Sequence, residues 1–453
     1  MAGRLTLGEL RALTEKGEVD TVLVCQTDMQ GRLMGKRFHA EHFCEEAHDE
    51  THSCNYLIAT DMEMETVGGY ASASWAAGYG DYTMVPDLGT LRLTPWLEGT
   101  ALVLCDVIDH AAHAEVPHSP RAMLKRQAAR AAGMGFTPMM ASELEFYLFR
   151  QSYEEAHALG HRGLETTAAY NEDYHIFQTT KEEGVMRALR NGLRGADIPV
   201  ENTKGEADAG QEEINIRYAD ALTMADRHVI AKNGIKEIAW AKGRAASFMA
   251  KWSFDHAGSS CHVHQSLMGE DGPAFFDPEA PYGMSSTMRS YVAGLLAHAG
   301  EITLALAPYV NSYKRFVAGT FAPTKAVWSK DNRTAGYRVV GEGTKAVRVE
   351  CRVGGADLNP YVAFSALLAA GLSGIEQGLE LEPEFDGDAY GGEGREIPKT
   401  LREATDAFER SAMLRAALGD EVVDHYVRAA RWEQEETDRR VTDWDLRRGF
   451  ERA

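Results

Sequence analysis

Four short stretches of the chain alternate polar and apolar side chains with the period of a β-strand. In the stretch ASELEFYLF, Ala141 to Phe149, the carboxylates Glu143 and Glu145 share one face while Leu144 and Phe146 lie on the other. Two carboxylates at such positions are roughly 7 Å apart, and burying them without cationic partners is costly. This stretch alone is compatible with a solvated edge strand or with a cation site.

The same design recurs in three later stretches. They are QEEINIRYA with Glu213, Asn215 and Arg217 on one face, CHVHQSL with His262, His264 and Ser266, and VRVECRV with Arg348, Glu350 and Arg352. Antiparallel sheets commonly pair an apolar face with a polar one, but an outer surface would carry Lys, Thr and Ser rather than Glu, His and Arg. The four stretches therefore predict a sheet that lines a charged cavity.

The remaining pattern divides the chain into two domains. An amphipathic helix within residues 1–20, a β-hairpin over residues 20–38 with its turn at Gly31, and an apolar strand over residues 101–107 predict a β-rich domain at residues 1–112. A linker over residues 110–120 leads to a helix with a Ser cap and a Pro in its first turn. Residues 113–453 are expected to form a larger α+β domain whose tail from residue 401 is helical.

Composition narrows the class of protein. The 453 residues are 44% hydrophobic and 25% charged, with a net charge of −21, which argues against nucleic-acid and acidic-membrane partners. No apolar run approaches the length of a membrane helix, and the N-terminus lacks the features of a signal peptide. The six cysteines include no C-x-x-C pair, so neither a zinc site nor a disulfide framework is indicated. We expect a cytoplasmic protein.

The acids and the histidine of these faces suggest the chemistry. The set comprises Glu143, Glu145, Glu206, Glu213, His262 and Glu350. Carboxylate oxygen suits Mg²⁺ and Mn²⁺, and six such ligands suit two or more ions. Arginines at positions 315, 333, 338, 348 and 352 offer forks for carboxylate and phosphate oxygens. Metals with arginines on one sheet are typical of phosphoryl transfer, although the chain lacks the G-x-x-x-x-G-K-[ST] phosphate loop.

Seven motifs in order carry a family resemblance. They are SELEFYLF, GEADAGQEE, GSSCHVHQSL, NSYKRFVAG, WSKDNRTAGYR, KAVRVECR and NPYVAF. Together they resemble the glutamine synthetase family of type I, over nearly the whole chain. The resemblance implies an N-terminal β-grasp domain and a catalytic domain with a curved antiparallel sheet flanked by helices. It also implies a dodecamer of two hexameric rings with active sites between subunits.

The resemblance also implies roles for individual residues. Glu145, Glu206 and Glu213 would hold one Mg²⁺ or Mn²⁺, and Glu143, His262 and Glu350 another, with two or three ions per active site. Substrate-binding positions match Arg315, Arg333, Arg352, Gly258 and, at the amine site, Tyr174; Arg315 and Arg333 would act on the reacting groups. ATP-binding positions match Tyr218, His264, Ser266, Arg338, Lys345 and Arg348.

The acceptor end departs from the family pattern. Where ammonia-using members read Tyr-Glu-Ala-Pro, this chain has Phe321 within Thr320–Pro323, and the Asp-Gly-Ser-Ser loop is replaced by a stretch in which only Asp61 offers a comparable charge. An Asn that helps to hold glutamate is here Ala257, which leaves the acid substrate open. Tyr390 lies where some members carry a regulatory adenylylation site, but its surroundings match poorly, which favours an unmodified loop tyrosine.

An aromatic wall suits an organic amine better than ammonium. We therefore expect an ATP-dependent γ-glutamyl–amine ligase that works through a γ-glutamyl phosphate. Asp61 is a candidate for deprotonating the amine. The first alternative is a glutamine synthetase whose ammonia site uses residues not matched here. The second is a non-catalytic structural relative, which predicts eroded metal ligands, whereas all six are present.

Overall fold

A helix and a β-hairpin open the chain, as predicted. The computed structural model describes residues 3–75 and 78–453. Helix α1 (Leu7–Glu15) begins with a capping box between Thr6 and Glu9. Strands β1 (Thr21–Thr27) and β2 (Leu33–His39) pair antiparallel, and Gly31 adopts φ +78° in the turn between them. This left-handed backbone conformation explains why the turn residue is a glycine.

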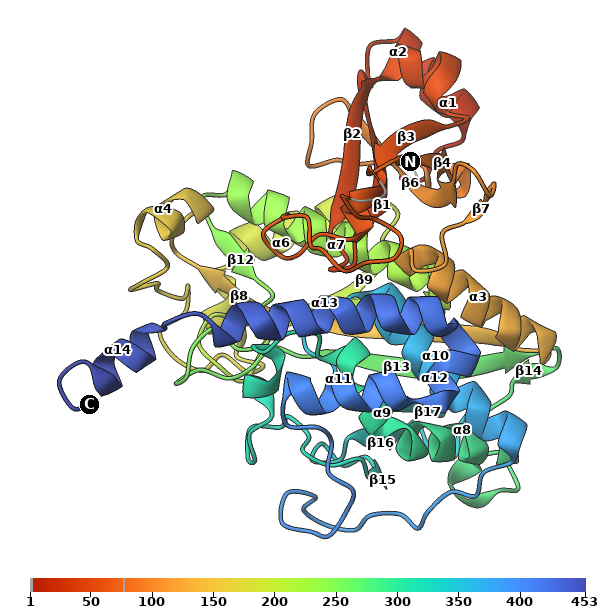
Figure 1. Ribbon diagram of the computed structural model, residues 1–453, viewed down its shortest axis with the longest axis vertical. Helices are drawn as coiled ribbons and strands as arrows, with labels where there is room; N and C mark the ends of the chain where they lie inside the picture. The colour runs from red at the N-terminus through yellow and green to blue at the C-terminus, as the bar shows by residue number, and fades with distance from the viewer. Residues whose placement is uncertain (1–2, 76–77) are drawn as a thin grey trace.

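The N-terminal sheet has seven strands in the order β2-β1-β6-β4-β3, with β5 and β7 also paired to β6. The further strands are β3 (Thr51–Cys54), β4 (Asp81–Pro86), β5 (Arg92–Leu93), β6 (Thr100–Asp109) and β7 (Ala114–Glu115). Strands β1 and β6 are parallel. This sheet, with α1 and α2 (Ala40–His42), stands at the top of Figure 1. Because β7 belongs to it, the stretch expected as a linker is partly a strand.

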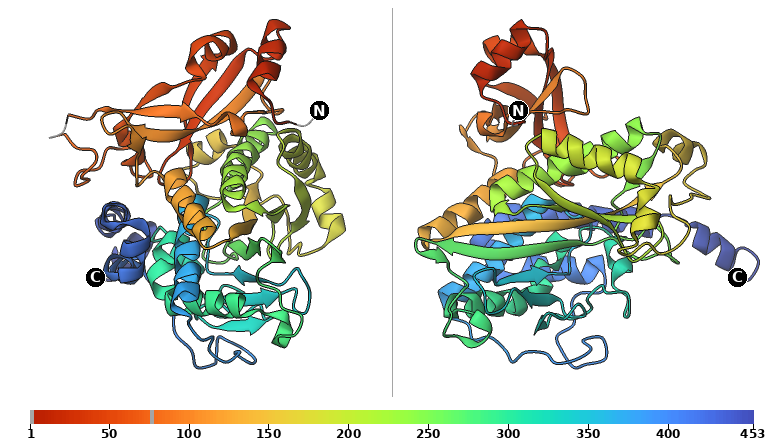
Figure 2. Two further views of the ribbon diagram at one scale, coloured as in Figure 1. Left: turned by 90° about the vertical axis from the view of Figure 1, so that its right-hand side faces the viewer. Right: turned by 180° about the vertical axis from the view of Figure 1, so that it is seen from behind.

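The larger sheet has ten strands in the order β15-β16-β17-β13-β8-β10-β9, with β11 and β12 paired to β8 and β14 to β13. Its strands are β8 (Thr137–Phe149), β9 (Val200–Gly205), β10 (Gln211–Ile216), β11 (Ala219–Asp220), β12 (Ala245–Ser247), β13 (Cys261–Gly269), β14 (Gly272–Pro273), β15 (Trp328–Lys330), β16 (Tyr337–Val340) and β17 (Arg348–Cys351). Only β15 and β16 pair in parallel. The long strands β8 and β13 run side by side across the domain (Figure 2, right). The four alternating stretches thus lie in one curved antiparallel sheet.

Helices cover the apolar side of this sheet. Leu144, Phe146 and Leu148 of β8 are buried in the main core together with residues of α3 and α7. The helices of this part are α3 (Pro120–Gly133), α4 (Tyr153–Ala158), α5 (Ile176–Thr180), α6 (Glu183–Gly195), α7 (Ala221–Ala241), α8 (Ser286–Ala297), α9 (Ala299–Leu306) and α10 (Pro360–Gln377). Ser119 stands at the N-cap of α3, but its side chain makes no capping hydrogen bond, so the expected cap is wrong in this detail.

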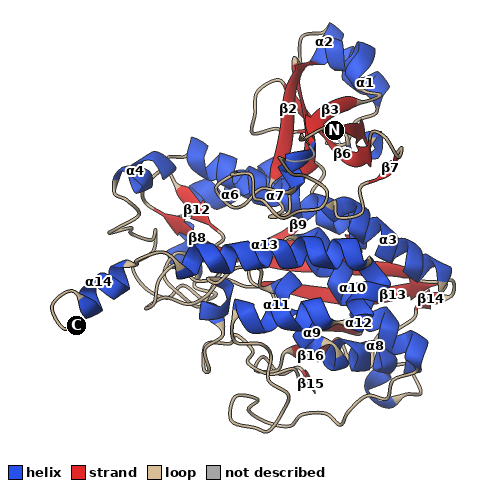
Figure 3. Ribbon diagram, viewed as in Figure 1, coloured by secondary structure: helices blue, strands red, loops and turns tan. Residues whose placement is uncertain are grey.

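The C-terminal tail is helical, as expected from its periodicity. It forms α11 (Leu401–Arg410), α12 (Ala412–Leu418), α13 (Asp420–Asp438) and α14 (Asp443–Gly449). Figure 3 shows α13 crossing the molecule, while α14 projects from the body with the C-terminus. Among the described residues, no helix has both the length and the apolar character needed to cross a bilayer.

Candidate active site

The polar face of the larger sheet lines a cavity of about 1300 Å³. Strands β8, β9, β10 and β13 contribute side chains, and loops around Tyr174, Gly258 and Phe321 complete the walls. Strand alternation directs the carboxylates and histidines into this cavity, while the apolar residues between them enter the core. The predicted charged cavity is therefore present.

One group of carboxylates joins β8, β10 and the turn before β10. Glu145 is paired with Glu213 across the two strands, and one oxygen each of Glu145, Glu206 and Glu213 lie within 4.8 Å of one another. Burial, together with the neighbouring Glu206, raises the pKa of Glu145 to about 8 and that of Glu213 to about 9. A divalent cation would relieve this crowding of buried negative charge, so the donor set fits Mg²⁺ or Mn²⁺.

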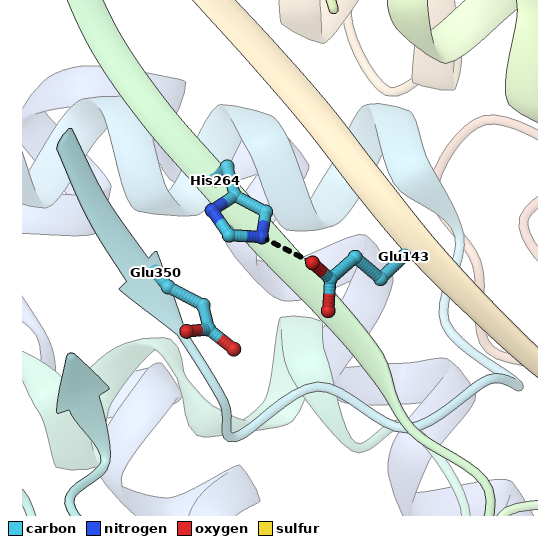
Figure 4. A group of neighbouring side chains, drawn as sticks. All are labelled: Glu143, His264 and Glu350. Atoms are coloured by element: carbon cyan, nitrogen blue, oxygen red, sulfur yellow. Dashed lines mark hydrogen bonds and ion pairs between the residues drawn. The ribbon is translucent and has the colours of Figure 1, made fainter. Parts of the chain in front are cut away.

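A second group joins β8, β13 and β17. Atoms of Glu143, His264 and Glu350 lie within 4.8 Å of one another, and His264 Nε2 is 2.8 Å from Glu143 Oε1 (Figure 4). His262 lies equally close, with its Nδ1 3.2 Å from Glu143 Oε2 and 3.6 Å from Glu350 Oε1. Burial opposes ionisation of Glu143, but hydrogen bonds with His262 and His264 hold its pKa below the usual range.

The two histidines differ in the hydrogen-bond partners of their ring nitrogens. Arg348 Nε donates to His264 Nδ1 at 3.2 Å, so His264 Nε2 carries the proton that it gives to Glu143. Both nitrogens of His264 are thus engaged. His262 Nε2, in contrast, is buried without a hydrogen-bond partner among the described residues. The nitrogen of His262 that faces the two carboxylates is Nδ1, so either His262 through Nδ1 or His264 through Nε2 could complete a metal site with Glu143 and Glu350.

Arginines surround the second group. Arg352 Nη1 donates to Glu350 Oε1 at 2.5 Å, and Arg338 Nη1 donates to Glu350 Oε2 at 3.0 Å. Burial raises the pKa of Glu350, but Arg352 and the histidines hold it at about 2. Glu350 is therefore ionised at neutral pH. Arg338, Arg348 and Arg352 all line the cavity.

Arg315 is arranged differently. Its Nη2 donates to the carbonyl oxygens of Arg352 and Gly354 at 3.2 and 2.9 Å, and its Nη1 donates to Ser260 Oγ at 3.2 Å. The side chain is 2% exposed and packs below Gly258, where a Cβ would meet Arg315 Cγ at 2.3 Å. Arg315 therefore supports the cavity wall and is not among the described residues that line the cavity, and its contact with substrate stays a prediction.

The other predicted substrate and nucleotide positions line the same cavity. They are Tyr174, Tyr218, Gly258, His264, Ser266, Phe321, Arg333, Lys345 and Arg348. Tyr218 lies just beyond the end of β10 at Ile216 rather than within the strand. Tyr174 and Phe321, 66% and 56% exposed, both have positive φ values of 55° and 58°. Such strained backbone at non-glycine residues is typical of functional loops.

Asp61 does not line this cavity. Its Oδ1 accepts a hydrogen bond from Glu65 N at 2.8 Å and its Oδ2 accepts one from Trp432 Nε1 at 3.0 Å. It lies at a separate small cavity of about 70 Å³ with Tyr70 and Trp432. Asp61 and the two carboxylate groups therefore do not share a cavity among the described residues. The hydroxyl of Tyr390 is buried in the described structure, which agrees with an unmodified loop tyrosine.

Sequence reasoning missed three residues of the site. Gln211 Nε2 donates to Gly258 O at 3.0 Å and Glu145 Oε2 at 3.2 Å, and Asp208 Oδ2 accepts from Ala257 N at 2.6 Å. Lys204 of β9 forms an ion pair with Glu206. Alternation with Glu213 and Glu206 could have identified Gln211 and Lys204, because each stands two residues before a predicted ligand.

Comparisons with known proteins identify relatives of this chain. The model for the glutamine synthetase catalytic domain matches residues 117–449. Gamma-glutamylethanolamide synthetase GlnA4 of Streptomyces coelicolor is 47% identical over 449 residues, which cover 99% of this chain and 96% of that protein. Glutamate–isopropylamine ligase of a Pseudomonas species is 37% identical over 445 residues, 97% of each chain. The ligand-free structure of GmaS superposes with a TM-score of 0.85 at 26% identity, covering 98% of this chain and 99% of that one.

The chain belongs to the glutamine synthetase family. Enzymes of this family use ATP and divalent metal ions, and the predicted family and fold are confirmed.

Proposed function

We propose that this chain is an ATP-dependent ligase that joins the γ-carboxylate of glutamate to an amine. One observation carries the proposal: Phe321 lines the same cavity as Glu145 of the first carboxylate group and Glu143 of the second, at the position where ammonia-using members carry a glutamate. The aromatic side chain offers an apolar wall and no charge that would attract ammonium. The two relatives named for their products or substrates, an ethanolamide synthetase and an isopropylamine ligase, support this choice.

The cavity residues would hold the cofactors as follows. Glu145, Glu206 and Glu213 would bind one Mg²⁺ or Mn²⁺, Glu143, His262 and Glu350 a second, and a third ion would join with the nucleotide. ATP would lie toward Tyr218, His264, Ser266, Arg338, Lys345 and Arg348. Bound divalent ions would offset the negative charge of the phosphoryl group during transfer. The closeness of His262 Nδ1 to Glu143 and Glu350 and the raised pKa values of Glu145 and Glu213 support this assignment.

The reaction proceeds in two steps. The glutamate γ-carboxylate attacks the terminal phosphorus of ATP, forming γ-glutamyl phosphate and releasing ADP. The amine nitrogen then attacks the carbonyl carbon of the γ-glutamyl phosphate, a C–N bond forms, the C–O bond to phosphate breaks with release of phosphate, and the amine loses one proton. Arg333 and Arg352 would orient the charged oxygens, while Tyr174 and Phe321 would contact the carbon skeleton of the amine. Asp61 of a neighbouring subunit is the proposed base.

Phosphate release tests the proposal. Purified protein with ATP, Mg²⁺ and glutamate should turn over with at least one of ethanolamine, methylamine, putrescine, spermidine or aniline, and much more slowly with ammonia. Comparable rates with ammonia would favour an ordinary glutamine synthetase. No release with any acceptor would favour a non-catalytic relative. Replacing glutamate with other dicarboxylic acids tests the consequence of Ala257.

We also propose that the chain assembles as a dodecamer of two hexameric rings, with active sites between subunits. The family resemblance supports this assembly, as does the absence of Asp61 from the described lining of the cavity in its own subunit. A cytoplasmic location stays a prediction.

A further inference from the structure

Lys204 places a cation in the cavity wall beside Tyr174, the residue predicted at the amine site. It lies on β9 opposite Glu213 of β10 and lines the cavity, with 17% of its side chain exposed. Its Nζ forms an ion pair with Glu206 and lies 3.7 Å from Asp173 Oδ1 and 4.5 Å from the centre of the Tyr174 ring. An aromatic face and a carboxylate together make a binding place for an ammonium group, and a lysine of the chain itself fills it.

The fixed backbone around Tyr174 keeps this arrangement in place. Tyr174 N donates to Gly205 O at 3.3 Å, which ties the loop to the end of β9 beside Lys204. Tyr174 has φ +55°, a conformation that persists only where the surroundings hold it. The ring and the lysine therefore form one unit at the cavity wall.

The other carboxylates described in the cavity lining do not offer a second site of this kind for an ammonium group. Glu143, Glu145, Glu206 and Glu213 belong to the proposed metal groups, and Glu201 lies near the start of β9. Asp173 and the Tyr174 ring are the partners of Lys204 that do not compete with a metal. A second ammonium on a substrate would thus find the aromatic face covered and a like charge beside it.

We propose that Lys204 makes this enzyme select primary monoamines with uncharged tails and reject diamines and polyamines. The inference rests on the proposed function and names the class of its acceptor. Specificity then comes from a repulsive element as well as from an attractive apolar wall.

Amino alcohols and diamines of equal length, with two to four methylene groups, provide the test. The wild type should favour the amino alcohol by at least about tenfold in kcat/KM, measured as phosphate release with glutamate and ATP. Lys204→Gln should lower this preference at least about tenfold, because Asp173 and the Tyr174 ring become available to the distal ammonium. Lys204→Arg, which keeps the charge, should retain the preference.

Two further variants sharpen the result. Lys181 stands over the rings of Tyr170 and Phe177 at 5.5 and 5.1 Å on the same segment, so Lys181→Gln is a matched control that should leave the preference unchanged. Asp173→Asn removes the exposed countercharge of Lys204 and should increase the preference. Because Asp173→Asn is expected to change the preference in the opposite direction, this variant tests the role of Lys204 even if Lys204→Gln does not fold.

The outcomes separate the two proposals. Two outcomes would overturn the role of Lys204 and leave the amine ligase intact. In the first, Lys204→Gln turns over amino alcohols with a preference over diamines within about twofold of the wild-type preference. In the second, the wild type itself favours diamines. A wild type that turns over ammonia but no amine would overturn the ligase proposal and this inference with it.

Discussion

Glu145 is the buried carboxylate at the centre of the proposed metal site. Its Oε2 accepts hydrogen bonds from Ser260 N at 2.6 Å and Gln211 Nε2 at 3.2 Å. Burial beside Glu206 raises its pKa to about 8, so in the metal-free protein at neutral pH the group is mostly protonated. A glutamine side chain resembles that neutral form.

Glu145→Gln should therefore fold but lose metal binding and activity. We expect turnover to fall at least about a hundredfold, because an amide is a poor ligand for Mg²⁺ and leaves the phosphoryl charge uncompensated. Calorimetric titration with Mg²⁺ or Mn²⁺ and phosphate release measure the two effects. The exposed Glu279 gives the control, Glu279→Gln, which should behave as the wild type. Full metal affinity in Glu145→Gln would refute the assignment.

Phe321 decides which nucleophile reaches the activated acid. Phe321→Glu should raise kcat/KM for ammonia relative to the best amine by about tenfold or more, because a carboxylate attracts ammonium and the apolar wall is lost. Phe321→Gln removes the ring without adding charge, so the difference between the Glu and Gln variants measures the effect of the negative charge on acceptor choice. The same phosphate-release assay measures both. An unchanged ratio in the Glu variant would show that Phe321 does not set acceptor choice.

At the scale of single residues, alternation was sufficient to place most of the site. Period two put Glu143 and Glu145 on one face, and the structure brings both into the cavity. Arg315 is the last residue of a short 3-10 helix at Ser312–Arg315, where no strand period fixes the direction of a side chain. The location of Asp61 outside the cavity could not be predicted from the sequence either, because its partner Trp432 lies 371 residues away in sequence.

At the scale of elements, three distant segments meet at a pair of buried histidines. His425 of α13 and His118, just before α3, stack with ring centres 4.1 Å apart. His425 Nε2 donates to Ile58 O at 2.8 Å, and His118 Nδ1 lies 3.2 Å from Glu421 Oε1. The expected linker is thus fixed between the N-terminal domain and the C-terminal helices. Hydrophobic periodicity predicted the helices and strands, but it did not predict this contact between them.

The histidine pair predicts loss of stability in mild acid. Burial, with Arg126 nearby, lowers the pKa of His118 to about 4, and burial beside His118 lowers the pKa of His425 well below its usual value. As the pH falls from about 6.5 to about 4, the unfolded chain binds protons that the folded chain does not. The free energy of unfolding should then fall by about 1 kcal/mol per pH unit for each histidine.

Urea unfolding between pH 5 and pH 7 measures this slope. His118→Gln should make the slope shallower by about 1 kcal/mol per pH unit relative to the wild type, whatever its effect on stability at pH 7. His39→Gln, at an exposed position on β2, should keep the wild-type slope. Equal slopes in the wild type and His118→Gln would contradict the role of the buried pair.

At the scale of the whole molecule, the order of the motifs predicted the family and the two-part fold, since each motif belongs to one element of the sheet. The described lining of the cavity of about 1300 Å³ includes carboxylates of both groups but not Asp61, whose carboxylate lies at another cavity with Trp432. If Asp61 takes part in the reaction, it does so in the cavity of a neighbouring subunit.

Mixing inactive subunits tests this arrangement. Asp61→Asn and Glu145→Gln should each be inactive alone, but co-expression in equal amounts should restore about a quarter of the wild-type activity, because about a quarter of the shared sites then combine two intact halves. Glu145→Gln mixed with Glu213→Gln should recover nothing, since both residues belong to one cavity. Light scattering on the same samples measures the size of the oligomer. Full activity of Asp61→Asn alone, or no recovery in the first mixture, would contradict a base supplied by the neighbouring subunit.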